Sequence, residues 1–96
     1  MKKDNQQSLG DAIRSFLAAH NLEDKYLETE IYSRWDELAG RAINVKTRKV
    51  NFREGVLTVF LSSATLRQEL SMRRAEMIER LNQRIRNSPV RELVFK

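Results

Sequence analysis

The strongest constraint on the fold is a pattern with a period of two from Val45 to Leu61, in which Glu54-Gly55 stands between two runs. A period of two is typical of β-strands, and a two-residue connection containing glycine predicts a tight β-hairpin. One face of this hairpin is apolar and should face a core, while the opposite face is basic with one aromatic ring, Phe60. The opposite face is interpreted either as the solvated back of a sheet or as a docking surface. The expected cross-strand pairs are Arg53 with Val56, Phe52 with Leu57, Asn51 with Thr58, Val50 with Val59, and Lys49 with Phe60.

Helical periodicity precedes the hairpin. A first helix is predicted over residues 9–20, with Asn21 as its stop. A second helix should follow, ended or bent by Gly40. The first apolar stripe consists of Leu9, Ile13, Phe16 and Leu17, and the second of Leu27, Ile31, Trp35, Leu38 and Ala42. Aromatic residues on the second helix could stack on bases, but their helical spacing favours core and rim positions for Tyr26, Tyr32 and Trp35.

The segment after the hairpin does not fit one continuous helix. At about 100° per residue, an unbroken helix would place Arg74 within the apolar stripe and Met72 outside it. Two helices over residues 64–71 and 75–87 resolve this conflict, because a turn between them lets Arg73 and Arg74 reach solvent and turns Met72 inward. Ser63 is the expected N-cap of the first of these helices.

A third strand completes the predicted domain. Ser88-Pro89 should stop the last helix, and residues 90–95 then form a strand with Leu93 and Phe95 on the inner face. The chain has 96 residues and no cysteine, which suffices for one core without disulfides. We therefore predict a flexible N-terminus over residues 1–8 and a single α+β domain over residues 9–96. Its helices pack on one face of a three-stranded sheet.

Charge is distributed unevenly along the chain. Residues 1–40 hold five basic and eight acidic residues, a net charge of −3, whereas residues 41–96 hold 13 basic and five acidic residues, a net charge of +8. Together with a sequence pI near 10, this asymmetry indicates a nucleic-acid partner. The alternative is a charged surface that only keeps the protein in solution.

Catalytic chemistry finds little support in the residues. The carboxylates are scattered over helix surfaces, and no nucleophile triad, zinc motif or phosphate-binding glycine loop is present. His20 is the only histidine, and its place near a helix C-terminus favours a capping role. We expect no enzyme, no metal, no cofactor and no small-molecule substrate. The chain has neither an export signal nor a long apolar run. We therefore expect a cytoplasmic protein that neither spans nor binds a membrane.

The order of the predicted elements resembles a KH domain, most closely the second KH type. KH domains clamp nucleotides with a GxxG turn between two helices. Here that turn reads Ser71-Met72-Arg73-Arg74-Ala75, which lacks the glycines but carries two arginines as candidate phosphate contacts.

A more extensive resemblance covers Trp35 to Phe95. Its features occur in order along the chain: a W-x-x-L-x-G run at Trp35, Leu38 and Gly40, the hairpin at residues 54–59, Ser62-Ser63, residues 68–71, and Leu81-Asn82. The sequence thereby resembles the DciA-like family, small bacterial proteins whose characterised members load or activate the replicative helicase. The resemblance implies a KH-like domain whose partners are DNA and that helicase.

The sequence thus predicts an adaptor that binds single-stranded or tailed DNA without sequence preference and acts on the replicative helicase. The alternatives are a ribosome-associated RNA-binding module of KH-like fold and a protein-interaction domain without nucleic-acid affinity. The leading candidates for phosphate contacts are Lys49, Arg53, Arg73 and Arg74, followed by Arg48, Arg67 and Arg80. For the protein partner, the candidates are the acidic helix around Trp35 and the sheet face at Phe60.

Overall fold

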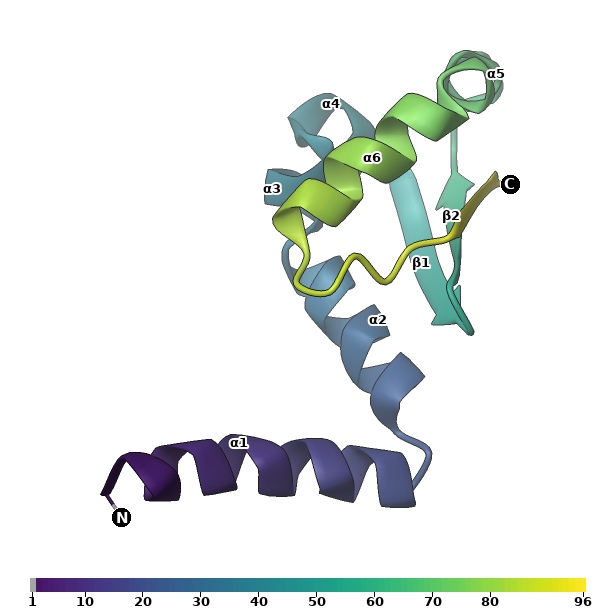
Figure 1. Cartoon of the computed structure of the whole chain (residues 1–96). Helices are drawn as coiled ribbons and strands as arrows, with labels where there is room; N and C mark the ends of the chain where they lie inside the picture. The colour runs from purple at the N-terminus through teal and green to yellow at the C-terminus, as the bar shows by residue number, and fades with distance from the viewer. Residues whose placement is uncertain (1) are drawn as a thin grey trace.

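The computed structural model describes the backbone of residues 2–96 and the side chains from Ser8 onward. The elements follow in the order α1 (Lys2–Ala19), α2 (Glu23–Ser33), α3 (Trp35–Ala39), α4 (Arg41–Asn44), β1 (Thr47–Arg53), β2 (Val56–Leu61), α5 (Ala64–Met72), α6 (Arg74–Arg84) and β3 (Glu92–Phe95). The sheet has the order β1-β2-β3, with β1 antiparallel and β3 parallel to β2 (Figure 1). The predicted α+β class is confirmed. The arrangement is compatible with a KH-like fold, which stays a prediction.

The predicted hairpin is confirmed in every cross-strand pair from Lys49–Phe60 to Arg53–Val56. Glu54 and Gly55 form its turn with φ values of 50° and 85°, a left-handed geometry that favours glycine. Gly55 also lies beneath the side chain of Arg91, and a Cβ added at Gly55 would collide with the guanidinium group of Arg91. The turn therefore favours glycine for its backbone geometry, whereas the flexible, exposed side chain of Arg91 can move aside for a Cβ.

One face of the sheet carries the core. Buried side chains of α2, α3, α5 and α6 pack with this face, and Trp35, which is only 1% exposed, belongs to the buried cluster. The indole N–H of Trp35 donates to the hydroxyl oxygen of Thr47 at 2.9 Å, and that hydroxyl donates to the carbonyl of Ile43 at 2.7 Å. The buried strand residues are Val50, Phe52, Leu57, Val59, Leu61, Leu93 and Phe95, as the alternation predicted for the hairpin and the last strand.

Helix α2 lies along the outer edge of β1. Two of its carboxylates, one helical turn apart, accept hydrogen bonds from backbone N–H groups of the hairpin. Glu28 Oε2 accepts from Phe52 N at 2.9 Å, and Asp24 Oδ2 accepts from Glu54 N at 2.8 Å. The spacing of residues i and i+4 on a helix thus matches that of residues i and i+2 on a strand.

The predicted break in the second half of the chain is confirmed. Helix α5 ends at Met72, Arg73 has φ −112° and ψ 22°, and α6 begins at Arg74. Both arginines are exposed, as expected. The prediction that Met72 turns inward was wrong, since its side chain is 78% exposed. Only Arg73 leaves helical geometry, so Met72 remains on α5 about 200° round the helix from the buried Leu70.

Helix α6 ends at Arg84 rather than near residue 87. The segment that follows is held by the side-chain amide of Asn82, whose Nδ2 donates to the carbonyl of Val90 at 2.7 Å and whose Oδ1 accepts from Val90 N at 3.0 Å. Within this segment Asn87 and Ser88 have φ values of 71° and 44°, a geometry that costs energy for serine. The amide of Asn82 therefore fixes the chain that leads into β3.

The predicted second helix is divided at Arg34 and again at Gly40, whose φ of 96° redirects the chain and leaves Ala42 exposed.

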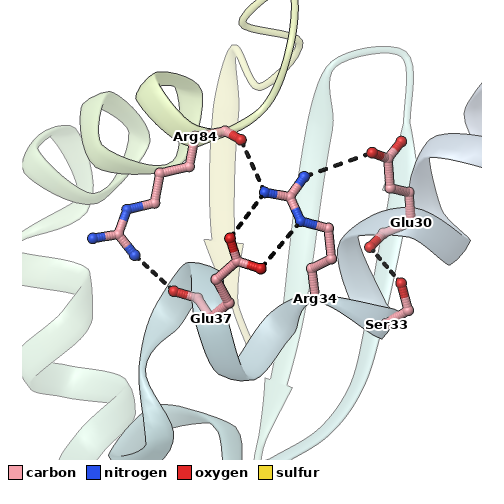
Figure 2. A network of polar contacts seen from close by, with 5 residues as sticks. All are labelled: Glu30, Ser33, Arg34, Glu37 and Arg84. Atoms are coloured by element: carbon pink, nitrogen blue, oxygen red, sulfur yellow. Dashed lines mark hydrogen bonds and ion pairs between the residues drawn. The ribbon is translucent and has the colours of Figure 1, made fainter.

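The side chain of Arg34 connects α3 to the end of α6 (Figure 2). Its guanidinium group contacts the Glu37 carboxylate at 3.2 and 3.4 Å and donates to the carbonyl of Arg84 at 3.1 Å. This contact lowers the pKa of Glu37 and raises the pKa of Arg34. The pair stabilises the fold above the ordinary glutamate pKa of 4.5 and loses this effect as the pH falls through the lowered value.

Helix α1 projects from the body of the molecule and contacts it mainly at α2 (Figure 1). It ends as predicted at Asn21, which has φ 55°, and His20 Nδ1 lies 2.8 Å from the Phe16 carbonyl oxygen, in agreement with a capping role. The helix begins at Lys2, within the segment over residues 1–8 that was expected to be flexible. Met1 lies outside the described residues, and the flexibility of this segment stays a prediction. None of the described helices is long and apolar enough to cross a membrane.

Candidate nucleic-acid interface

A basic hollow lies at one end of the outer face of the sheet. It has a volume of about 390 Å³ and is formed where the start of β1, the end of β2, the first turn of α5 and the C-terminal residue meet. Its lining contains four cationic side chains and no acidic side chain: Arg48, Lys49, Phe60, Leu61, Arg67 and Lys96. We call this site the Phe60 hollow. Its charge suits a phosphate-bearing ligand.

A β-bulge brings two consecutive cations into the hollow. The pairing register of β1 shifts between Thr47 and Lys49, so Arg48 is the extra residue on its strand. In a regular strand, neighbouring side chains point to opposite faces. The bulge instead allows Arg48 and Lys49 to line the same hollow.

The aromatic ring in the hollow already interacts with a cation. Lys49 Nζ lies over the Phe60 ring, 5.1 Å from its centroid, and the two residues are cross-strand partners on the outer face. The ring is half-buried. The hollow thus combines a flat apolar surface with mobile positive charge.

The structure separates the other predicted phosphate contacts from this hollow. Arg73 and Arg74 are exposed at the turn between α5 and α6, with Arg80 exposed further along α6. Among the side chains that the structure describes, no ion pair involves Arg73, Arg74 or the cations of the Phe60 hollow. The α5–α6 turn is therefore a second exposed basic site.

Arg53 lies in different surroundings. It lines a hollow at the other end of β1 that also contains four carboxylates, those of Glu23, Asp24, Glu28 and Glu54. A polyanion approaching Arg53 would be repelled by these groups. Of the four leading candidates for phosphate contacts, Arg53 is thus the least suited to that role.

The two candidates for partner contact occupy opposite environments. Trp35 is buried, so it serves the core and cannot touch a partner; its assignment as a contact residue is corrected here. Phe60 is accessible, but its four cationic neighbours indicate an anion rather than an apolar protein surface.

An apolar surface that sequence reasoning did not identify as exposed lies on α1. Leu9, Ile13 and Phe16 are 63%, 51% and 55% exposed. Ile13 also lines a notch of about 620 Å³ between α1, α2 and the end of α6. The charged residues of this notch are Arg14, Arg34, Arg84 and Arg86 against Glu23 and Glu30, so its rim is net positive. The helical spacing predicted the stripe, but no sequence signal showed that α1 leaves the body of the domain.

Lys96 was also missed, because its position beside Phe60 depends on the parallel pairing of β3 with β2. A main-chain oxygen of Lys96 accepts from Leu61 N at 2.7 Å, which holds Lys96 beside the hollow. Within the described residues, no group of three or more potential metal ligands is assembled.

Comparison with known proteins gives one result. The family model described as "Dna[CI] antecedent, DciA" matches residues 8–95, nearly the whole chain. No curated protein and no solved structure matches the sequence.

Proposed function

The chain belongs to the DciA family, which is associated with helicase loading, and from this premise we propose that it is an adaptor joining nucleic acid to the replicative helicase. It holds single-stranded or tailed DNA through phosphates, without reading sequence, and presents a separate surface to the helicase. The observation that carries this proposal is the Phe60 hollow, in which four cationic side chains meet without an acidic side chain.

Phosphate binding of this kind follows from counterion release. Each phosphate neutralised by lysine or arginine frees condensed cations, so affinity depends strongly on salt and weakly on sequence. The Phe60 hollow and the α5–α6 turn are the two proposed phosphate sites, because most of their cations are exposed and none forms an ion pair among the described side chains. Single carboxylates do lie near both sites, Glu28 beside Arg48 and Lys49 and Glu69 beside Arg73. Arg84 and Arg91 contribute less, since their guanidinium groups donate to the backbone carbonyls of Glu37 and Glu54.

We expect the affinity for single-stranded DNA to fall with salt, with a log-log slope of about −0.7 for each phosphate contacted. The double variant Arg48→Ala with Lys49→Ala should bind several-fold more weakly and lose about 1.4 of that slope. Arg73→Ala with Arg74→Ala should act in the same direction. Fluorescence anisotropy at several salt concentrations measures both quantities.

A matched control removes the same charge elsewhere. Lys25 and Arg41 are exposed and pair with Glu28 and Asp36, so the double alanine variant at these positions should retain the wild-type slope. An equal loss in all three double variants would show that only net charge matters. An affinity independent of salt would refute phosphate binding. Clearly tighter binding of an RNA of the same sequence would favour the RNA-binding alternative.

For the helicase, the surface that we propose is the α1 stripe with the adjacent notch. Exposed apolar patches rimmed by polar residues mark protein–protein interaction sites. The apolar floor of the notch is formed by Ile13, Tyr26, Leu27 and Ile85, and its net positive rim suits an acidic segment. The occupant is therefore an amphipathic segment of the helicase with acidic flanks.

Replacing Ile13 and Phe16 together with serine should abolish capture of the cognate replicative helicase, because both side chains belong to the exposed stripe. DNA affinity and the free energy of unfolding should stay near wild type, since both residues are about half exposed. A pull-down with purified helicase measures capture, and a parallel DNA titration shows whether DNA affinity is retained.

The matched control is Ala18→Ser, a polar change about 180° round α1 from Leu9, which should leave capture intact. Unchanged capture by the Ile13 and Phe16 variant would place the helicase elsewhere. Failure of the wild type to retain any replicative helicase at low salt would refute the adaptor function.

A further inference from the structure

We propose that the Phe60 hollow holds one unpaired base of a single-stranded nucleic acid, stacked on the Phe60 ring while the neighbouring phosphates contact the surrounding cations. This inference rests on the proposed function and deepens it. It assigns to the hollow a contact with the base, which phosphate binding does not require, and so a preference for strands whose bases are free.

The composition of the hollow supports a nucleotide rather than an isolated anion. A phosphate needs only cations, yet here the half-buried ring of Phe60 lies among Arg48, Lys49, Arg67 and Lys96. The volume of about 390 Å³ lies within the range of small-ligand sites, roughly 300–1,000 Å³. Stacking platforms that bind single strands pair an aromatic ring with a positively charged groove in this way.

The position of Lys49 allows a base to replace its ammonium group on the face of the Phe60 ring. Its ammonium lies 5.1 Å from the centroid of Phe60, over the ring face that a base would occupy. The lysine stem is flexible and its charge is attracted to phosphate. When a base binds, the Lys49 ammonium can move to the adjoining phosphate. The Phe60 ring then contacts the base in place of the ammonium, and the ammonium pairs with the phosphate.

The outer face of the sheet provides further polar groups along which the nucleic-acid strand could continue beyond the hollow. The next cross-strand pair on this face is Asn51 with Thr58, which provides an amide and a hydroxyl beside the Lys49–Phe60 pair. These groups are half-buried, as is Phe60. In a duplex the bases are stacked and paired, so their faces cannot reach the ring, whereas the bases of a single strand can.

The test compares two oligonucleotides of equal length and charge, one of deoxythymidine and one with abasic sites throughout. The wild type should bind the base-bearing strand roughly tenfold more tightly, and Phe60→Leu should lose this preference while retaining the salt slope. Phe60→Trp should keep the preference, and its added tryptophan fluorescence should be quenched by the base-bearing strand alone.

The outcomes separate the inference from the function beneath it. Salt-dependent binding with equal affinity for both strands would overturn base stacking and leave phosphate binding standing. A base preference that survives Phe60→Leu would place the base on another part of the surface and also overturn the inference. Salt-independent binding, or none, would overturn both. The oligonucleotide comparison uses the wild type, so it does not depend on how any variant folds.

Discussion

Replacing Trp35 with alanine is expected to lower the free energy of unfolding by roughly 3–5 kcal/mol, the range for deleting a buried aromatic side chain. The indole is 1% exposed and lies in the core cluster with residues of the sheet and of α6. Its removal leaves a cavity and also frees the Thr47 hydroxyl from its indole donor. Trp35 is the only tryptophan, so denaturant unfolding should be followed by circular dichroism rather than by fluorescence.

Tyr32→Ala is the matched control, because it deletes an aromatic ring from the same helical region at a side chain that is 56% exposed. It should change stability by less than about 0.5 kcal/mol. A comparable loss in the two variants would mean that burial of Trp35 does not hold the core together.

Asn82→Leu is expected to cost about 2–4 kcal/mol, since it removes two hydrogen bonds and leaves the backbone groups of the buried Val90 without these partners. The loss should also appear as faster amide exchange at Val90, whose N–H donates to Asn82. The same substitution at the exposed neighbour Gln83 should be nearly neutral. If the two leucine variants were equally stable, the segment before β3 would be held by something other than Asn82.

The parts of the fold that sequence predicted well are those with local causes. The hairpin register follows from alternation and a glycine turn, and the break at Arg73 follows from the phase of Leu66, Leu70 and Met77. Met72 was misplaced because the phase conflict shows that a break exists but not how many residues leave the helix. The segment after the early end of α6 is held by the contact of Asn82 with Val90, eight residues away, which no periodicity reveals.

The residues of the candidate site could be predicted from sequence in part, but their arrangement could not. Composition and charge singled out Arg48, Lys49 and Arg67 as basic candidates and Phe60 as an aromatic on the same sheet. They did not reveal that the bulge at Arg48 and the pairing of β3 bring these side chains together with Lys96. Conversely, Arg53 was favoured on the charge of its strand, while the carboxylates around it come from α2 as well as from the hairpin turn.

The carboxylates of Asp24 and Glu28 have a consequence for self-association. An edge strand with free N–H groups is a template for strand addition by another chain, the route by which exposed sheets aggregate. On β1 the donors of Phe52 and Glu54 are already bound by α2, so an incoming strand would first have to displace two charge-assisted hydrogen bonds. Part of the acidity of the first 40 residues thus protects the sheet edge, and leucine at both carboxylates would leave the N–H groups of Phe52 and Glu54 without these acceptors.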